Sequence, residues 1–149
     1  MKEQITALRQ KIDALSKIVS GIAPNGAPLI NGSSVALIMS KAWLGKALGE
    51  LGVDTPYKND GNRKSINDIE PTADTSSIEN HFDALTPRNT IEWIDYARQE
   101  IEKVSDEIKN IPTQGLSREF AICRTNSWNL ACEARMLLGF YLEFLRNNG

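Results

Sequence analysis

The chain has 149 residues, with 17 Lys and Arg, 19 Asp and Glu and one His, so its formal net charge is −2. Hydrophobic residues make up 41% and charged residues 24%, a composition typical of soluble globular domains that excludes a disordered or fibrous chain. The slightly acidic balance excludes a broad basic surface for duplex nucleic acid, although a few local cations can still hold a small anion. There is no apolar run of about 20 residues and no signal-peptide apolar block, so we expect an intracellular protein with no membrane partner.

The residues that most often build metal sites and nucleophile sites are scarce. Cys123 and Cys132 are expected in one helix, about 13 Å apart, which is too far for a disulfide, so both thiols should be free. One His and two Cys are too few for the usual zinc site. A Ser-His-Asp triad would need His81, which no motif surrounds. We therefore expect no metal, no cofactor and no catalytic residue.

The chain begins with apolar residues that recur every three or four positions, the spacing of a helix that packs on another helix. These residues are Ile5, Leu8, Ile12, Leu15, Val19 and Ile22. Residues 24–32 are rich in Pro, Asn and Gly and predict a loop of about ten residues. Ser33 or Ser34 is expected to cap a second helix that runs to Gly52. Two helices joined by one loop form an antiparallel hairpin over residues 1–52.

A polar stretch, residues 53–75, follows the first hairpin. It is too long for an ordinary connection, which indicates either a linker or a functional loop. Residues 76–79 have the spacing of a capping box and predict a short helix over residues 78–85. Thr86 directly before Pro87 predicts the start of the next helix.

The second half of the chain repeats the pattern of the first half. Each apolar residue of the next helix lies 89 positions after a member of the first heptad. These residues are Ile94, Ala97, Ile101, Val104, Ile108 and Ile111. Arg98 matches Arg9 at the same offset, and residues 134–139 match residues 40–45 at an offset of 94. The matches indicate two copies of one helical hairpin.

The second copy has the longer second helix, predicted from about Ser117 to Arg146. Because a lone hairpin cannot bury its apolar seam, the two copies should pack together. We therefore predict an all-α fold in which two tandem antiparallel hairpins, residues 1–52 and 87–149, form one small bundle. A long polar loop and a short helix, residues 53–86, join them.

Arginines on the last helix are the main candidates for an anion site. Arg118 follows Ser117 in the first turn, where free backbone N–H groups favour a bound anion. Arg124 and Arg135 lie further along this helix, and Arg98 lies on its partner helix. Each of them can instead pair with a carboxylate on the solvated surface.

The last helix resembles a known family of phage proteins. Ser117-Arg118-Glu119, Thr125 and residues 133–139 are similar to the second helix of the phage anti-CBASS and Thoeris anti-defence hairpin family. Residues 41–49 resemble the end of the same helix, and residues 69–74 are also similar to phage sequences. Members of that family are small helical sponges that bind cyclic nucleotide immune signals without cleaving them.

The resemblance implies a phage immune-evasion protein in the cytoplasm of an infected bacterial host. Its ligand would be a cyclic di- or trinucleotide or a cyclic ADP-ribose isomer, and its working form a homo-oligomer, a trimer or a hexamer. In the family, Arg and Thr of the second helix contact phosphates and bases, and aromatic or arginine planes can hold bases by stacking. The resemblance points to Arg118 and Thr125, and after them to Arg98 and Arg135, as ligand-binding residues, and Trp128, Phe82 and Tyr57 are available as stacking platforms. Trp93 is a further aromatic platform.

Two other functions stay open on the sequence. A Mg²⁺-dependent nucleotide pyrophosphohydrolase needs several carboxylates on facing helices. Glu92 with Asp95, and Glu102 with Asp106, have helical spacing, but the facing helix offers only widely separated acidic residues. A structural or protein-interaction bundle would explain the apolar seams but gives no reason for the arginine and threonine pattern.

Overall fold

The computed structural model describes residues 1–22, 27–53 and 90–148. These residues contain four helices, which are α1 (Lys2–Ser20), α2 (Pro28–Glu50), α4 (Thr90–Lys109) and α5 (Arg118–Asn148). There is no strand in this part of the chain, so the expected all-α fold is confirmed.

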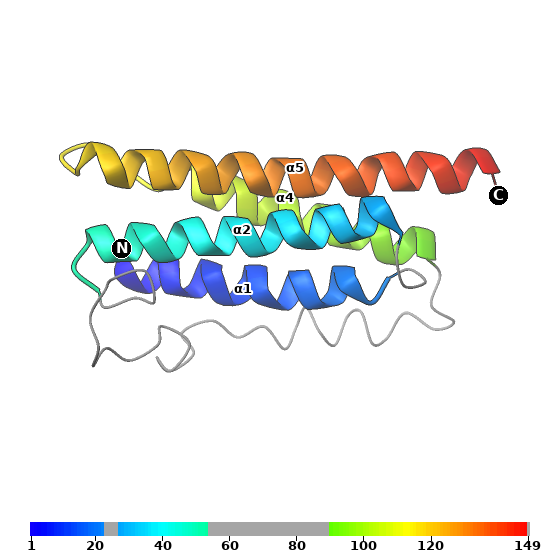
Figure 1. Ribbon diagram of the computed structural model, residues 1–149, viewed down its shortest axis with the longest axis horizontal. Helices are drawn as coiled ribbons and strands as arrows, with labels where there is room; N and C mark the ends of the chain where they lie inside the picture. The colour runs from blue at the N-terminus through cyan, green and yellow to red at the C-terminus, as the bar shows by residue number, and fades with distance from the viewer. Residues whose placement is uncertain (23–26, 54–89, 149) are drawn as a thin grey trace.

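The helices form an antiparallel bundle (Figure 1). α1 packs on α2 and α4 packs on α5, which gives the two predicted hairpins. The most extensive contact joins α2 to α5, and α1 lies against α4 with a Lys11–Glu107 ion pair of 3.7 Å. The two hairpins therefore pack side by side through their second helices.

The two predicted heptads form the core of the bundle. Every member from Ile5 to Val19 and from Ile94 to Ile111 is at most 3% exposed. Only Ile22, after the end of α1, is half-buried. Full burial of one such aliphatic side chain stabilises the fold by about 1.5–3 kcal/mol relative to exposure, so these seams determine how the helices pack.

α2 begins several residues earlier than the sequence predicts. Its first residue is Pro28, whose fixed φ and missing N–H suit the first helical position. The expected cap at Ser33 or Ser34 is wrong, because both residues are buried inside the helix. Ser33 Oγ donates to the Ala134 carbonyl at 2.8 Å, and Ser34 Oγ donates to the Ser16 carbonyl at 3.3 Å. These serines hold α2 against its neighbours instead of starting it.

α5 begins and ends close to its predicted limits. Gly115 has a φ of 80°, a conformation that favours glycine, and turns the chain toward the helix. Ser117 then caps α5, since the Phe120 backbone N–H donates to Ser117 Oγ at 3.1 Å. The first turn of α5 thus has the geometry that the Ser117-Arg118 pair predicts.

Contacts within one hairpin recur in the other. In the first hairpin, Arg9 Nε donates to the Lys41 carbonyl at 3.2 Å, and the Lys41 ammonium pairs with Asp13 at 2.9 Å. In the second hairpin, Arg98 Nε donates to the Arg135 carbonyl at 3.4 Å, and the Arg135 guanidinium pairs with an α4 carboxylate at 3.3 Å. Arg98 lies 89 positions after Arg9, and Arg135 lies 94 positions after Lys41. These are the two offsets at which the sequence repeats.

The contact between the hairpins is also symmetric. Ser33 donates to the Ala134 carbonyl at 2.8 Å, and Ser127 donates to the Ser40 carbonyl at 2.9 Å. Ser127 and Ala134 lie 94 positions after Ser33 and Ser40, so exchange of the two hairpins exchanges the two hydrogen bonds. An approximate twofold axis therefore runs between α2 and α5, in agreement with the predicted duplication.

The end of α2 and the start of α4 lie at opposite ends of the bundle (Figure 1). α2 is about 35 Å long, so the chain needs at least about ten residues to return along it. Part of the length of the polar connection therefore has a topological reason. The expected short helix over 78–85 and the helix start at Thr86-Pro87 lie outside the described residues. None of the helices described has the length and apolarity to span a bilayer.

Asp13 links α1 to α2 and gives the fold a pH dependence. Burial of the Asp13 carboxyl raises its pKa, but hydrogen bonds and positive charge from Lys41 and Lys17 lower it by more, so the pKa lies below its ordinary value. The lysine ammonium groups lie 2.9 Å and 3.0 Å from the carboxylate. The resulting stabilisation is complete above the ordinary pKa of about 4 and is lost as the pH falls through the lowered pKa.

Asp13→Asn should therefore make the fold less sensitive to acid. We expect the difference in unfolding free energy between pH 6 and pH 3, measured by urea denaturation, to be smaller in this variant than in the wild type. Asp106→Asn changes an exposed carboxylate of α4 that forms no ion pair with any described residue, so it serves as the control. An unchanged difference in Asp13→Asn would show that the Asp13 pairs do not contribute to stability.

Candidate functional site

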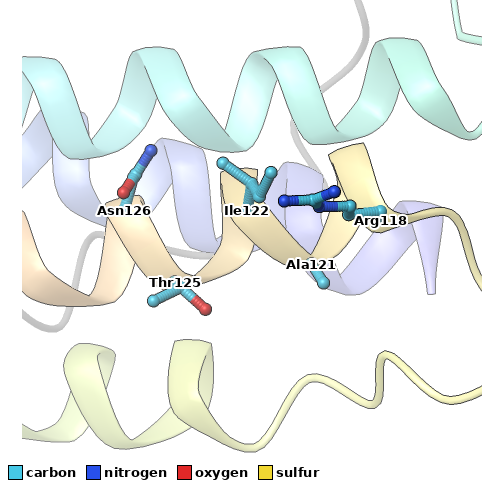
Figure 2. Close-up of a pocket in the computed structure, with 5 residues that line it drawn as sticks. All are labelled: Arg118, Ala121, Ile122, Thr125 and Asn126. Carbon is cyan, nitrogen blue, oxygen red and sulfur yellow. The ribbon is translucent and has the colours of Figure 1, made fainter.

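A pocket lies on the outer face of α5, over the first three turns of the helix. It has a volume of about 250 Å³ and is lined by Arg118, Ala121, Ile122, Thr125 and Asn126. These residues share one face because positions three, four, seven and eight apart are neighbours on a helix. Figure 2 shows Ile122 and Asn126 on the α2 side of α5 and Thr125 on the α4 side, with the Arg118 side chain extended along the helix.

The polar side chains of this pocket have no partner within residues 1–22, 27–53 and 90–148. The Arg118 guanidinium is exposed and forms no ion pair or hydrogen bond with these residues. The Thr125 hydroxyl and the Asn126 amide are half-buried and form no hydrogen bond with them. Backbone N–H groups of the first turn add positive potential at this end of α5, and the Glu119 carboxylate in the same turn offsets part of it.

Three other arginines of the second hairpin are engaged in packing. Arg98 Nε donates to the Arg135 carbonyl, and the Arg98 guanidinium lies against Gly139, where an added Cβ would come within 3.2 Å of it. Arg135 pairs with Glu102 at 3.3 Å. Arg124 donates to the carbonyl at the end of α4 at 2.7 Å. These three side chains join α4 to α5, whereas Arg118 makes no such contact with the described residues.

The structure therefore brings together some of the expected ligand-binding residues and separates others. Arg118 and Thr125 line the same pocket. Arg98 and Arg135 lie together at the contact of α4 with α5, outside the lining of that pocket. This second pair occupies positions equivalent to Arg9 and Lys41, which make the same contact in the first hairpin, and this indicates a role in holding each hairpin together.

The expected aromatic platforms are not gathered at the pocket. Trp128 is half-buried, and the Lys109 ammonium lies 5.5 Å from its ring centroid. Trp93 is 6% exposed and belongs to the core, so little of its ring is open to a base. Tyr57 and Phe82 lie outside the described residues.

Sequence reasoning missed three residues of the pocket, Ala121, Ile122 and Asn126. A signal for Ile122 and Asn126 was present, because positions 118, 122 and 126 follow one another at intervals of four and form one stripe of a helix. Asn126 also directly follows Thr125, which the resemblance had already indicated. These two residues add an apolar floor and an amide to the expected arginine and threonine.

The acidic residues and the thiols give no reactive cluster in the part of the chain that is described. No group of three or more His, Cys, Asp or Glu that could hold a metal ion lies among these residues. Cys123 and Cys132 are free, as the sequence predicts. Burial raises the pKa of both thiols, which keeps them protonated and weakly nucleophilic at neutral pH.

The pocket offers one cation, one hydroxyl, one amide and an apolar floor on a single helix. Such a set can hold an anion by charge-assisted hydrogen bonds and hold an uncharged part of the same ligand by neutral ones. No carboxylate, imidazole or thiol is among the residues that line it. Comparison with known proteins yields no match, whether to a family model, to a curated protein or to a solved structure.

Proposed function

We propose that the chain is a binding protein that sequesters a small cyclic nucleotide without cleaving it. The observation that carries this proposal is that Arg118 and Thr125 line one pocket and have no partner among the described residues. An arginine can meet a phosphate with two parallel hydrogen bonds, and backbone N–H groups at a helix N-terminus add to this attraction. Thr125 and Asn126 supply neutral hydrogen-bonding groups for the rest of the ligand.

The charge of the chain suits a small anion better than a long one. A cyclic di- or trinucleotide carries only two or three negative charges, so a few arginines are enough to neutralise it. The net charge of −2 and the slightly acidic composition disfavour a long polyanion such as duplex nucleic acid. Arg118, which has no partner among the residues that the structure describes, is therefore consistent with this ligand class.

We also propose that the working form is a homo-oligomer, a trimer or a hexamer, in which a second copy completes the pocket. Small-molecule sites commonly have about 300–1,000 Å³ and enclose most of their ligand. The pocket here has about 250 Å³ and is formed by one helix. Exposed apolar side chains on α2 and α5 supply a surface for such a contact. They are Val35, Ile38, Met39, Ile122, Met136, Phe140 and Phe144, each 44–55% exposed.

The ligand class and the biological setting rest on the resemblance of residues 117–139 to the phage family. A sponge of this kind would act in the cytoplasm of the infected bacterial host, where it would lower the concentration of the immune signal. This activity needs binding groups and no catalytic group, metal or cofactor.

The test is to incubate the purified protein with a cyclic dinucleotide, a cyclic trinucleotide or a cyclic ADP-ribose isomer and to measure the melting temperature. A ligand at about 100 times its Kd stabilises the folded state by about 2.7 kcal/mol, which raises the Tm of a domain of this size by several degrees. We expect at least one of the three to do so. After denaturation, chromatography of the released small molecule should return that ligand intact, and a linear dinucleotide serves as the control.

Each other outcome contradicts part of the proposal. Release of reaction products would identify an enzyme, such as a nucleotide pyrophosphohydrolase. The absence of a melting shift with all three ligands would favour a helical protein-interaction bundle, for which the exposed apolar side chains are the supporting observation. Light scattering gives the oligomeric state of the protein with its ligand, and a monomer there would exclude completion of the pocket by a second copy.

A further inference from the structure

The chemistry of the pocket changes along the axis of α5. Arg118 at one end is cationic, Ala121 and Ile122 in the middle are apolar, and Thr125 and Asn126 at the other end are neutral and polar. From the first to the last of these residues the helix rises about 12 Å. A nucleotide carries a phosphate at one end and, beyond the ribose, a base with an apolar ring face and a hydrogen-bonding edge. The order of groups along the pocket therefore matches a nucleotide that lies along α5 with its phosphate at the start of the helix.

Asn126 is a polar residue of this pocket whose side chain has no role in the fold that the described contacts show. Its side chain is half-buried and lies on the α2 side of α5 with Ile122 (Figure 2). Its amide forms no hydrogen bond with the residues that the structure describes. Asparagine is also among the weaker helix formers, so it does not serve the stability of α5. A pocket side chain with an unused donor and an unused acceptor is free to contact a ligand.

Comparison of the two hairpins distinguishes residues that hold the fold, which recur in both copies, from residues that occur in one copy only. The contacts inside each hairpin occur in both copies at equivalent positions. The cation and the amide of the pocket do not, because Gly32 is the equivalent of Asn126 and the position equivalent to Arg118 precedes the start of α2. A Cβ at Gly32 would come 3.2 Å from Leu137 Cδ1, so a side chain there would crowd the contact of α2 with α5. The cation and the amide of the pocket are therefore additions to α5 alone.

We infer, resting on the proposed function, that Asn126 reads the base of the bound nucleotide and selects adenine. A carboxamide presents one donor beside one acceptor. Adenine presents its amino group next to a ring-nitrogen acceptor on both of its outer edges, whereas guanine presents two acceptors on one of them. Adenine thus meets the amide in either orientation of the ring, and Ile122 supplies apolar contact to the ring face.

The test compares the binding of cyclic di-AMP and cyclic di-GMP by isothermal titration calorimetry. We expect the wild type to bind the adenine ligand more tightly, by up to about tenfold, because guanine matches the amide only through the edge that carries its ring N–H. Asn126→Leu keeps the volume of the side chain and removes both hydrogen bonds, so it should bind the two ligands equally. Asn129→Leu is the matched control, because Asn129 is an exposed residue of α5 outside the pocket lining and its replacement should keep the preference.

Arg118→Ala distinguishes this inference from the proposed function. It should weaken both ligands by the same factor and keep the adenine preference, because it removes a phosphate contact. A wild type that prefers guanine, or an Asn126→Leu variant that keeps the adenine preference, overturns the role of Asn126 while the proposed function stands. A wild type that binds neither ligand overturns the inference, and the melting experiment with the three ligand classes then decides whether the proposed function falls with it.

Discussion

Arg118→Ala should weaken the binding of the cyclic nucleotide roughly tenfold to a hundredfold and leave the Tm of the free protein unchanged. The guanidinium is exposed and has no partner among the described residues, so its removal takes no contact from the fold. A hydrogen bond to a charged group contributes about 1.5–3 kcal/mol, which corresponds to this change in affinity. Calorimetric titration with the ligand found in the melting experiment measures the effect.

Two further variants make this result specific. Arg146→Ala is the matched control, because Arg146 is also an exposed arginine of α5 but lies near the opposite end of the helix. It should bind with wild-type affinity. Arg118→Lys should recover part of the lost affinity, since lysine keeps the charge but cannot form two parallel hydrogen bonds to one phosphate. Wild-type affinity in Arg118→Ala would mean that the ligand binds elsewhere.

The elements that local periodicity determines could be predicted from the sequence. The heptad from Ile5 to Val19 and its repeat from Ile94 to Ile111 mark the buried faces of α1 and α4. The offsets of the repeat also predicted equivalent positions, and Arg9 and Arg98 do make equivalent contacts. The buried face of a helix can be predicted from apolar residues three and four positions apart, because this spacing does not depend on which helix it packs against.

The start of α2 could not be predicted in this way. The Asn31-Gly32 pair is typical of a turn, and Ser33 is typical of a helix cap, so the sequence favoured a loop through residue 32. In the fold these residues lie where α2 approaches α5, with Gly32 against Leu137 and Ser33 bonded to the Ala134 carbonyl. Small side chains are needed there because α5 packs against this part of α2. That tertiary contact cannot be seen in the local sequence of α2.

The candidate site could be predicted in part for the same reason. Arg118 and Thr125 share a face of one helix, so their positions follow from helical spacing alone. Whether an arginine is paired depends instead on the register of α4 against α5. In that register Arg135 forms an ion pair with the Glu102 carboxylate, whereas Arg118 has no partner among the described residues.

Ser40→Leu should lower the free energy of unfolding by about 3 kcal/mol, which for a chain of this length lowers the Tm by about 10 °C. Ser40 and Ser127 are both fully buried where α2 contacts α5, and their Oγ atoms lie 2.9 Å apart. Ser40 Oγ donates to the Ser127 carbonyl at 2.8 Å, and Ser127 Oγ donates to the Ser40 carbonyl at 2.9 Å. A leucine side chain does not fit between backbones held this close, so the helices must move apart.

Two controls separate the loss of space from the loss of the hydroxyl. Ser40→Ala fits the contact and removes one hydrogen-bonding group, so it should lower the free energy of unfolding by only about 1 kcal/mol. Asn31→Leu places the same leucine at an exposed position of α2 and should change stability by less than about 0.5 kcal/mol. Urea unfolding followed by circular dichroism measures all three variants. If Ser40→Leu were as stable as Ser40→Ala, the second helices of the two hairpins could not be in close contact at this point, and the twofold arrangement of the bundle would be wrong.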